Sequence, residues 1–436
     1  MKLQSQIESR TLQEQAGIDP ENGKVKLKVA YTMSRFPKLT ETFILYEVLA
    51  LEKMGVQVEL FPLIHEKQPV KHPEAVRMEK RAHFHPFVSM KILAANFYYM
   101  LHKPRKYFGA LVEVLTATIG SLNFFVGVIG IFPKCARMAF EMERAGIHHL
   151  HAHFANHPAA AALIIHRLTG IPYSFTAHGS DLHVDRTMLA KKILNSAFAI
   201  TISNFNKNVM IEECGESVRN KVQVVHCGVD VEQFKPNSKM AINRPFQILC
   251  VASFEEVKGH QFLVAACKIL EERGVDFRCH FVGYGPLRKR VIQQVEDLGL
   301  TERFIIHAAR PRLEIIKMLS ESDVKVLPSV PTKQGKREGI PVVLMEAMAS
   351  GLPVVSSRLS GIPELVEEGV SGILVEPRDV NGLVEALLNL HRDSELRQRM
   401  GAAGRAKVLR EFNLEKNAEQ LAQLFLANIS NLKENR

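Results

Sequence analysis

Short apolar segments alternate with longer amphipathic segments along the chain, from about residue 25 onward. The short segments are rich in β-branched and aromatic residues, which is typical of buried strands, and the longer ones carry apolar residues at helical spacing. Strands separated by helices of about 10–15 residues indicate right-handed βαβ units. The pattern therefore predicts an α/β protein with parallel sheets.

This alternation occurs twice, in two halves joined by a polar segment. The predicted strands of the first half are KVKLKVAYTM, VQVELFPL, HLHAHF, YSFTAHG, AFAITIS and KVQVVHCG. Those of the second half are FQILCVAS, DFRCHFVG, VKVLPS, PVVSS and GILVEP. Phe234–Asn243 is polar, contains Pro236 and is the best candidate for a linker. The sequence thus predicts two Rossmann-like domains that face each other across a cleft, with ligands at the carboxyl ends of the strands.

Domain boundaries follow from these segments. We predict a polar N-terminal tail over residues 1–24, a first Rossmann-like domain over residues 25–238 and a second over residues 239–410. Residues 411–436 carry apolar side chains at helical spacing and are predicted to form a last helix.

Composition narrows the class of partner. Lys and Arg number 56 against 46 Asp and Glu in the 436 residues, so we expect anionic partners such as phosphorylated small molecules or an acidic membrane. Nucleic acid is the least expected partner, because the chain has no Trp and no nucleic-acid-binding motif. The six cysteines form no CxxC pair and the start of the chain lacks an apolar signal segment, which together predict a reduced, cytosolic protein.

One apolar segment raises the question of a membrane. Val114–Pro133 holds twenty residues without a charge, which is long enough to cross a bilayer. Its Thr, Ser, Asn and Gly residues weaken a spanning helix, and basic and aromatic residues flank it from Lys103 to Arg137. This mixture favours an interfacial helix pair in peripheral contact with an anionic membrane. Ordinary buried helices and a true span are the alternatives.

The segment with the clearest chemistry is REGIPVVLMEAMASGLPVV, residues 337–355. Within it, Glu338 and Glu346 lie eight residues apart, Pro341 can open a helix and Gly351 can end it. Glu338 then lies in the loop before the helix and Glu346 on the helix itself. A carboxylate at the second position can accept two hydrogen bonds from a ribose diol.

The turn before this helix would bring backbone N–H groups to a helix N-terminus, an arrangement that binds phosphate. The turn consists of Gly339, Ile340 and Pro341. The alternative is a solvated acidic helix with a capping Glu. The apolar AMASGLPVV run would bury the helix against the sheet and therefore favours a nucleotide site.

This segment resembles the E-x7-E signature of retaining glycosyltransferases of family 4, which have the GT-B fold. Other segments are similar to motifs of that family, in the same order: SRFPKLTETFI, FTAHGSDL, ISNFNKN, VVHCGVDVEQFKP, VASFEEVKGH, VGYGP and GVSGILVEP. The resemblance covers nearly the whole chain from about residue 26 and is to exopolysaccharide and lipopolysaccharide members. It implies transfer of a sugar from a nucleotide-diphosphate sugar to a glycan or lipid-linked acceptor, at the inner face of the cytoplasmic membrane and with no metal or further cofactor.

The resemblance also implies roles for domains and residues. The first domain would bind the acceptor and the second the nucleotide sugar, and the last helix would cross back onto the first domain. The implied catalytic residues are Glu338, facing the developing oxocarbenium charge, and His178, facing the donor sugar and phosphate. Lys258 would neutralise the diphosphate and Glu346 would hold the ribose. Gly283 and Gly285 would let the backbone approach the nucleotide.

Two departures from the family pattern affect the site. Ser253 stands where the family has an arginine that holds the diphosphate, so we expect another cation, Arg310 or Arg337, to supply that charge beside Ser253. The N-terminal loop carries Thr40 and Glu41 in place of paired glycines. Thr40 is predicted to cap the following helix and Glu41 to contact the acceptor.

The histidines allow a rival interpretation. An HxH segment on a strand places both imidazoles on one face, and His151, His153, His178 and Asp181 can be assembled into a zinc site with an activated water. Because no regular ligand spacing follows, we expect hydrogen-bonded residues and no metal, with His153 as an acceptor-binding candidate. A metal-dependent hydrolase, a sugar-nucleotide epimerase of GT-B architecture and a catalytically silent scaffold stay open as alternatives.

Overall fold

The computed structural model describes residues 27–38, 41–67, 73–236 and 244–434, with side chains as far as Asn428. Within these residues the chain forms two compact units. The second unit consists of Ile202–Asn206 and His226–Asn417, and the first unit contains the remaining segments. The sequence predicted a boundary between residues 238 and 239, so the observed second unit begins earlier. The predicted N-terminal tail and most of the predicted linker lie outside the described residues.

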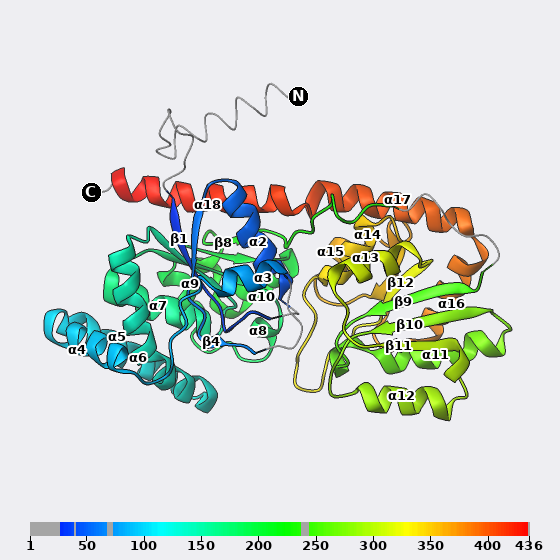
Figure 1. Ribbon diagram of the computed structural model, residues 1–436, viewed down its shortest axis with the longest axis horizontal. Coiled ribbons are helices and arrows are strands. Elements are labelled where there is room, and N and C mark those ends of the chain that lie inside the picture. The colour runs from blue at the N-terminus through cyan, green and yellow to red at the C-terminus, as the bar shows by residue number, and fades with distance from the viewer. Residues whose placement is uncertain (1–26, 39–40, 68–72, 237–243, 435–436) are drawn as a thin grey trace, which may run out of the picture. The chain divides into compact units, whose positions relative to one another are not determined.

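The first unit is built on a six-stranded parallel sheet (Figure 1). Its strands, in spatial order, are β3 (Gln57–Leu60), β1 (Lys28–Thr32), β5 (His149–His153), β6 (Tyr173–Ala177), β7 (Phe198–Thr201) and β8 (Val222–Val224). A separate parallel pair contains β2 (Arg35–Phe36) and β4 (Ile64–His65). Strands β5, β6 and β7 are buried at every residue, as expected when helices cover both faces of a parallel sheet.

The helices of this unit connect and cover the strands. They are α2 (Thr42–Lys53), α3 (Pro73–Glu79), α4 (Met90–His102), α5 (Pro104–Ala117), α6 (Leu122–Ala145), α7 (His157–Thr169), α8 (Ser180–His183), α9 (Leu189–Asn195) and most of α10 (Asn204–Cys214), with a 3-10 turn over Glu216–Val218. The last helix, α18 (Leu414–Glu434), contributes its residues from Ala418 onward. The apolar alternation therefore predicted the fold class of this half correctly.

The charge-free segment 114–133 does not form one helix. Helix α5 ends at Ala117, and α6 begins at Leu122 after a turn in which the Ser121 hydroxyl accepts a hydrogen bond from the N–H of Phe124 (3.3 Å). Helix α6 is long and apolar enough to cross a membrane, but half of its most apolar window is buried in the protein. The turn excludes a single span over residues 114–133, and the second half of α6 is a core helix.

The second unit repeats the architecture with its own six-stranded parallel sheet. Its strands, in spatial order, are β11 (Phe304–His307), β10 (Phe277–Val282), β9 (Phe246–Val251), β12 (Val324–Leu327), β13 (Val354–Ser357) and β14 (Gly372–Val375). Its helices are α11 (His260–Glu272), α12 (Arg288–Asp297), α13 (Arg312–Ser320), α14 (Val342–Ala349), α15 (Ile362–Leu365), α16 (Val380–Arg392) and α17 (Ser394–Glu411). The strand order reverses between β9 and β12, and ligands of such sheets bind at the carboxyl ends of the strands flanking this point.

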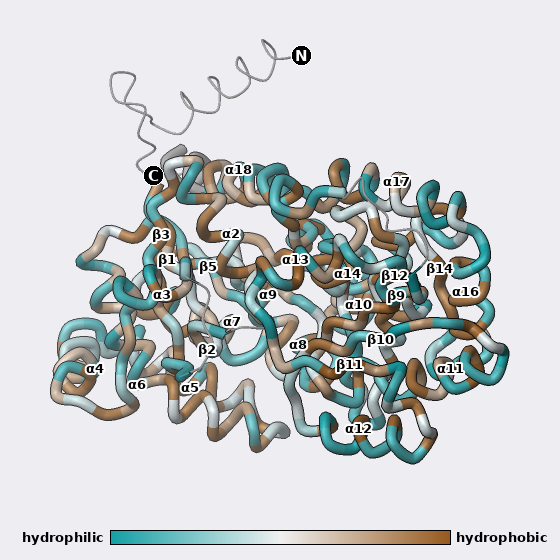
Figure 2. The backbone as a smooth tube through the Cα atoms, turned by 45° about the vertical axis from the view of Figure 1, so that its right-hand side comes forward, coloured by the Kyte–Doolittle hydropathy of each residue, from teal (hydrophilic) through white to brown (hydrophobic). Residues whose placement is uncertain are grey.

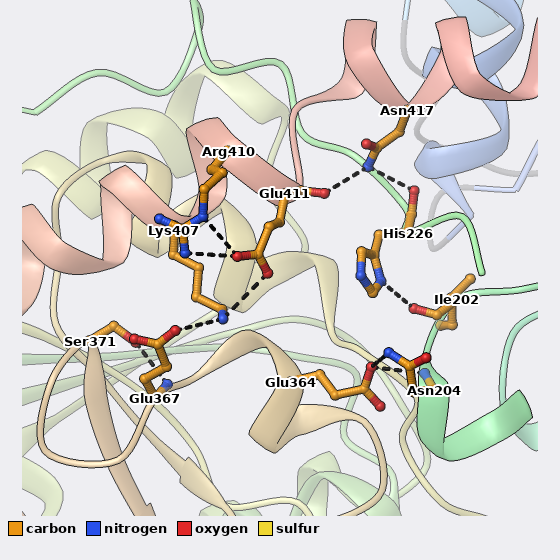
Figure 3. A network of polar contacts seen from close by, with 10 residues as sticks. All are labelled: Ile202, Asn204, His226, Glu364, Glu367, Ser371, Lys407, Arg410, Glu411 and Asn417. Carbon is orange, nitrogen blue, oxygen red and sulfur yellow. Dashed lines mark hydrogen bonds and ion pairs between the residues drawn. The ribbon is translucent and has the colours of Figure 1, made fainter. Parts of the chain in front are cut away.

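Polar contacts fix the separate segments of the second unit to one another (Figure 3). The Glu364 carboxylate accepts hydrogen bonds from the N–H groups of Asn204 (2.8 Å) and Phe205 (2.7 Å), at the start of α10. The Asn417 amide donates to the carbonyl oxygen of His226 (2.9 Å). The first turn of α10 and the first turn of α18 are therefore held to this unit by specific hydrogen bonds.

Candidate functional site

Helix α14 and the loop before it form the centre of the candidate site. Pro341 is the N-cap residue with an extended ψ of 120°, so the helix begins at Val342, one residue later than the sequence predicted. Gly351 has a φ of 72°, and the N–H of Leu352 donates to the carbonyl oxygen of Ala347 (3.0 Å), which ends the helix as predicted.

The two residues predicted to face the diphosphate and the sugar meet in this loop. The Lys258 ammonium lies 2.6 Å from Oε1 of Glu338, and both side chains are at most one-fifth exposed. Lys258 ends a 3-10 turn over Glu256–Lys258, after β9. The next residue, Gly259, has a φ of 67°, and a Cβ there would lie 1.9 Å from the carbonyl oxygen of Pro328. Close packing of the loops after β9 and β12 therefore sets the position of Lys258.

Glu346 projects from α14 beside a second lysine. Burial raises the pKa of Glu346 to about 7, and the positive charges of Arg312 and Lys325 oppose that rise. Lys325 of β12 is fully buried and its ammonium donates to the carbonyl oxygen of Val251 (3.4 Å). Burial lowers the pKa of Lys325 to about 8, and the charge of Glu346 acts in the opposite direction. Sequence reasoning missed Lys325, although a charged residue inside the apolar segment VKVLPS was a visible signal.

The glycines of VGYGP have a packing role beside the predicted one. A Cβ on Gly283 would lie 2.0 Å from the carbonyl oxygen of Ala252, and one on Gly285 would lie 2.7 Å from the backbone nitrogen of Phe254. The N–H of Phe254 donates to the carbonyl oxygen of Tyr284 (2.8 Å). The two glycines therefore let the loops after β9 and β10 pack backbone against backbone, which shapes the edge where a nucleotide would lie.

Arg310 and Arg337 are the two arginines proposed to supply the missing charge beside Ser253. Among the described residues, neither makes a contact near Ser253. Arg310 is exposed and lies 3.4 Å from Glu314, and Arg337 is exposed. The Ser253 hydroxyl instead donates to Glu255 (3.3 Å), whose carboxylate pairs with Lys336 (2.5 Å). The cations that the structure brings to this loop are thus lysines.

In the first unit, the structure brings His153 and His178 together at the carboxyl ends of β5 and β6. Nδ1 of His153 lies 3.0 Å from Nε2 of His178, and Nε2 of His153 lies 3.1 Å from Oε1 of Glu47. The Tyr31 hydroxyl donates to the same oxygen of Glu47 (2.8 Å). Because His153 is fully buried, it lies behind His178 and does not reach the surface itself.

Glu41, the second acceptor-binding candidate, is the N-cap residue of α2. Its carboxylate forms an ion pair with Lys38, and burial raises its pKa against the opposing charge of Lys38. No side-chain hydrogen bond from Glu41 caps the described helix. Thr40, which we predicted to cap it, lies outside the described residues.

The rival zinc set is not assembled as ligands. Both oxygens of Asp181 accept backbone hydrogen bonds, from Ala155 (2.7 Å), His178 (3.1 Å) and Gly179 (2.7 Å). The ring nitrogens of His151 are hydrogen-bonded to the hydroxyls of Ser174 (2.8 Å) and Thr176 (3.0 Å). Nitrogens and oxygens of Glu47, His151 and His153 lie within 4.8 Å of one another, but each of these groups already takes part in a protein hydrogen bond.

Two family models match adjoining parts of the chain. Residues 40–233 match "Glycosyltransferase Family 4" and residues 232–407 match "Glycosyl transferases group 1". Among curated proteins, the chain is 40% identical over 204 residues to the amylovoran biosynthesis glycosyltransferase AmsK of Erwinia amylovora, and 39% identical over 210 residues to the putative colanic acid biosynthesis glycosyltransferase WcaL of Escherichia coli K12. These matches cover 47% and 48% of this chain and 50% and 52% of the relatives, so the chain spans about half of their length.

Solved structures share the fold over almost the whole chain. A glycosyltransferase from Rickettsia africae aligns with a TM-score of 0.68 and 16% identity, over 93% of this chain and 99% of that one. The Anabaena protein HepE, solved in complex with UDP, aligns with a TM-score of 0.69 and 16% identity, over 91% and 99%. At this identity the likeness shows the fold, which agrees with the two parallel-sheet units predicted from the sequence.

Proposed function

We propose that this chain, which belongs to the glycosyltransferases of family 4 and group 1, transfers a sugar from a nucleotide-diphosphate sugar to a glycan or lipid-linked acceptor in polysaccharide biosynthesis. The relatives AmsK and WcaL, named for amylovoran and colanic acid biosynthesis, support the class of product. HepE, solved with UDP and with UDP-glucose, supports the class of donor. The observation that carries the proposal is the Lys258–Glu338 pair beside the start of α14.

The donor chemistry follows from the charges around this pair. The diphosphate would lie against the N–H groups of the turn Gly339–Pro341 and the start of α14, with Lys258 neutralising the leaving group. Glu346 would accept hydrogen bonds from the ribose, and Glu338, released from Lys258, would face the developing oxocarbenium charge. We propose retention of anomeric configuration, with the β-phosphate helping to take the acceptor proton and fixed cations serving without a metal or other cofactor.

The acceptor side of the proposal rests on the first unit. His178 would contact the reacting sugar and phosphate, and Glu41 would contact the acceptor. Both lie at the carboxyl edge of the first sheet, where the ring of Phe43 packs 4.6 Å from that of His178. A sheet edge with a carboxylate, an imidazole and an aromatic ring suits a hydroxyl-rich sugar acceptor.

A panel of nucleotide-sugars tests this proposal directly. One member is expected to raise the melting temperature of the protein and to be consumed only when an acceptor, such as a polyprenyl-diphosphate sugar, is present. EDTA is expected to leave the transfer rate unchanged. Consumption of the donor without any acceptor would instead favour an epimerase, and stabilisation by no member of the panel would refute the donor site.

We further infer peripheral contact with an anionic membrane, through apolar side chains on α4, α5 and the first half of α6. Twelve of the nineteen large hydrophobic side chains that are exposed in the described residues fall between residues 87 and 129. They are Phe87, Val88, Met90, Leu93, Phe97, Leu101, Phe108, Val112, Ile119, Leu122, Val126 and Ile129. Brown hydrophobic segments recur along these helices in Figure 2. An exposed apolar surface of this extent is typical of an interaction site.

The charges on this surface support an anionic membrane as its partner. Lys91, Arg105 and Lys106 are exposed among the apolar residues. The one acidic residue of segment 80–140, Glu113, is paired with Arg167 (2.8 Å). A face that is apolar and basic suits anionic headgroups above an acyl layer. The proposal implies a cytoplasmic protein held at the inner face of the membrane, near a lipid-linked acceptor.

Liposome flotation tests the membrane contact. The protein is expected to float with vesicles rich in phosphatidylglycerol, less with phosphatidylcholine alone, and less at high salt. The triple variant Leu93→Ser, Phe97→Ser and Phe108→Ser is expected to stay in solution. The matched control Leu313→Ser, an exposed residue of the second unit, should float like the wild type. Flotation that ignores lipid charge and salt would contradict the inference.

A further inference from the structure

Two residues behind His178, the buried His153 and the partly buried Glu47, have no part in the transfer chemistry as described above. Glu47 of α2 and His153 of β5 form a hydrogen-bonded chain that ends at the His178 imidazole. His153 and Tyr31, which also contacts Glu47, are completely buried. Burying this many polar groups costs free energy unless each is paired, so the arrangement calls for an explanation beyond packing.

We propose that Glu47 and His153 are positioning residues for sugar transfer, which hold the imidazole of His178 in one orientation and one hydrogen-bonding tautomer. This inference rests on the proposed function, in which His178 is a catalytic residue. It adds to that function the pair of side chains through which the protein sets the chemistry of His178.

The direction of the hydrogen bonds follows from the carboxylate, which can only accept. The Tyr31 hydroxyl donates to Oε1 of Glu47, and burial, together with the charge of Glu47, raises the pKa of Tyr31 so that it stays a phenol. Nε2 of His153 therefore also donates to Oε1. In the tautomer that donates from Nε2, His153 accepts at Nδ1 from the Nε2–H of His178, which leaves Nδ1 as the acceptor atom of a neutral His178.

The protonation state of His178 agrees with this assignment. Burial lowers the pKa of His178 well below its ordinary value. The ring is therefore neutral at physiological pH and has one donor and one acceptor nitrogen. A carboxylate behind a hydrogen-bonded histidine is the arrangement that fixes the tautomer of catalytic histidines in hydrolases.

The surroundings fix the ring in space as well. The rings of Phe43 and Phe154 lie 4.6 and 4.9 Å from that of His178. Phe154 has a φ of 79°, a left-handed conformation that is unfavourable for a bulky residue and is found where the surrounding structure imposes it. Asp181 accepts from the backbone N–H groups of Ala155 and His178, so it joins the loops after β5 and β6.

The experiment compares Glu47→Gln, which keeps the shape of the side chain, with Tyr31→Phe. Glu47→Gln is expected to lower kcat about tenfold or more, because an amide can donate to His153 and reverse the chain. The KM for the nucleotide-sugar should stay within about twofold, since the donor-binding residues other than His178 lie in the second unit. Tyr31→Phe removes a hydrogen bond from the same carboxylate oxygen but leaves the direction of the chain intact, and is expected to keep kcat within about threefold.

A double-variant cycle separates positioning from stability. If Glu47 acts through His178, the double variant Glu47→Gln, His178→Ala should be no slower than His178→Ala alone. Thermal unfolding of each variant shows whether it is folded, and His153→Gln replaces Glu47→Gln in the cycle if the latter does not fold.

Four results would overturn the proposal. They are additive losses in the cycle, a wild-type kcat in Glu47→Gln, a wild-type kcat in His178→Ala, and stoichiometric zinc whose removal lowers activity. The last would make Glu47 and His153 metal ligands. If the wild type transfers sugar and His178→Ala is equally active, this inference is refuted and the proposed function still holds. A wild-type chain that transfers no sugar from any donor refutes both.

Discussion

Replacing Glu346 with glutamine is expected to stabilise the protein in neutral and alkaline solution while removing donor binding. Burial raises the pKa of Glu346 from an ordinary value of 4.5 to about 7. The folded state therefore holds its proton more tightly than the unfolded state does, and stability is lost as the pH rises from 4.5 through 7. A pKa shift of this size corresponds to a loss of about 3 kcal/mol in the free energy of unfolding. Glutamine does not ionise, so the variant avoids this loss.

The assay is denaturant unfolding of the wild type and Glu346→Gln at pH 5 and pH 8. The free energy of unfolding of the variant, relative to that of the wild type, should increase by as much as about 3 kcal/mol from pH 5 to pH 8. Met345→Leu, a buried neighbour on the same helix that keeps the carboxylate, should follow the wild type. An advantage that is equal at both pH values would refute the reasoning, because Glu346 would then not be a buried, partly protonated acid.

Donor binding supplies the functional half of the same prediction. With a pKa of about 7, the ionised fraction of Glu346 rises about tenfold between pH 6 and pH 8. If the carboxylate grips the ribose, the wild-type Kd for the nucleotide-sugar should fall about tenfold over that range. Lys325→Met should move this transition to higher pH, since a positive charge near the carboxyl is lost. Calorimetric titration of nucleoside diphosphate at several pH values measures both effects.

Other expected outcomes concern the loops around the two sites. Lys258→Met should weaken nucleoside diphosphate binding at least about tenfold in calorimetry, because it removes a diphosphate cation and leaves Glu338 unpaired; unchanged affinity would place the diphosphate elsewhere. Gly259→Ala should lower stability by at least about 1–2 kcal/mol in denaturant unfolding, because the residue is left-handed and its Cβ would meet Pro328. Asp181→Ala should cost about 1–3 kcal/mol, because backbone N–H groups lose their acceptor; a wild-type melting temperature would contradict this.

The sequence predicted the two sheets because parallel strands buried on both faces give continuous apolar runs, which can be recognised without knowing their partners. The same local reasoning located α14, with an error of one residue at Pro341, whose ring fixes φ but leaves ψ free to be extended. It could not show that Lys258 pairs with Glu338, because the two residues are far apart in the chain and meet only through the order of the strands.

The glycines of VGYGP show another limit of local reasoning. A glycine signals a close approach, but the sequence does not say what approaches it. The approach of a nucleotide to Gly283 and Gly285 stays a prediction, and the structure adds the backbone of the preceding loop as a close neighbour of both. Lys325 was missed because a single lysine in an apolar strand usually extends its ammonium group to the solvent. In the structure the side chain of Lys325 is fully buried.

The row of histidines in β5 makes the first unit sensitive to acid. Burial lowers the pKa of His149 to about 3 and lowers that of His151 well below its ordinary value. The unfolded chain therefore takes up protons below about pH 6.5 that the folded strand refuses, and mild acidification weakens this half. In the second unit, burial lowers the pKa of His260 to about 3 as well, while the raised pKa of Glu346 gives that unit an opposing slope. Acid therefore weakens both halves through buried histidines, and in the second half protonation of Glu346 offsets part of that loss.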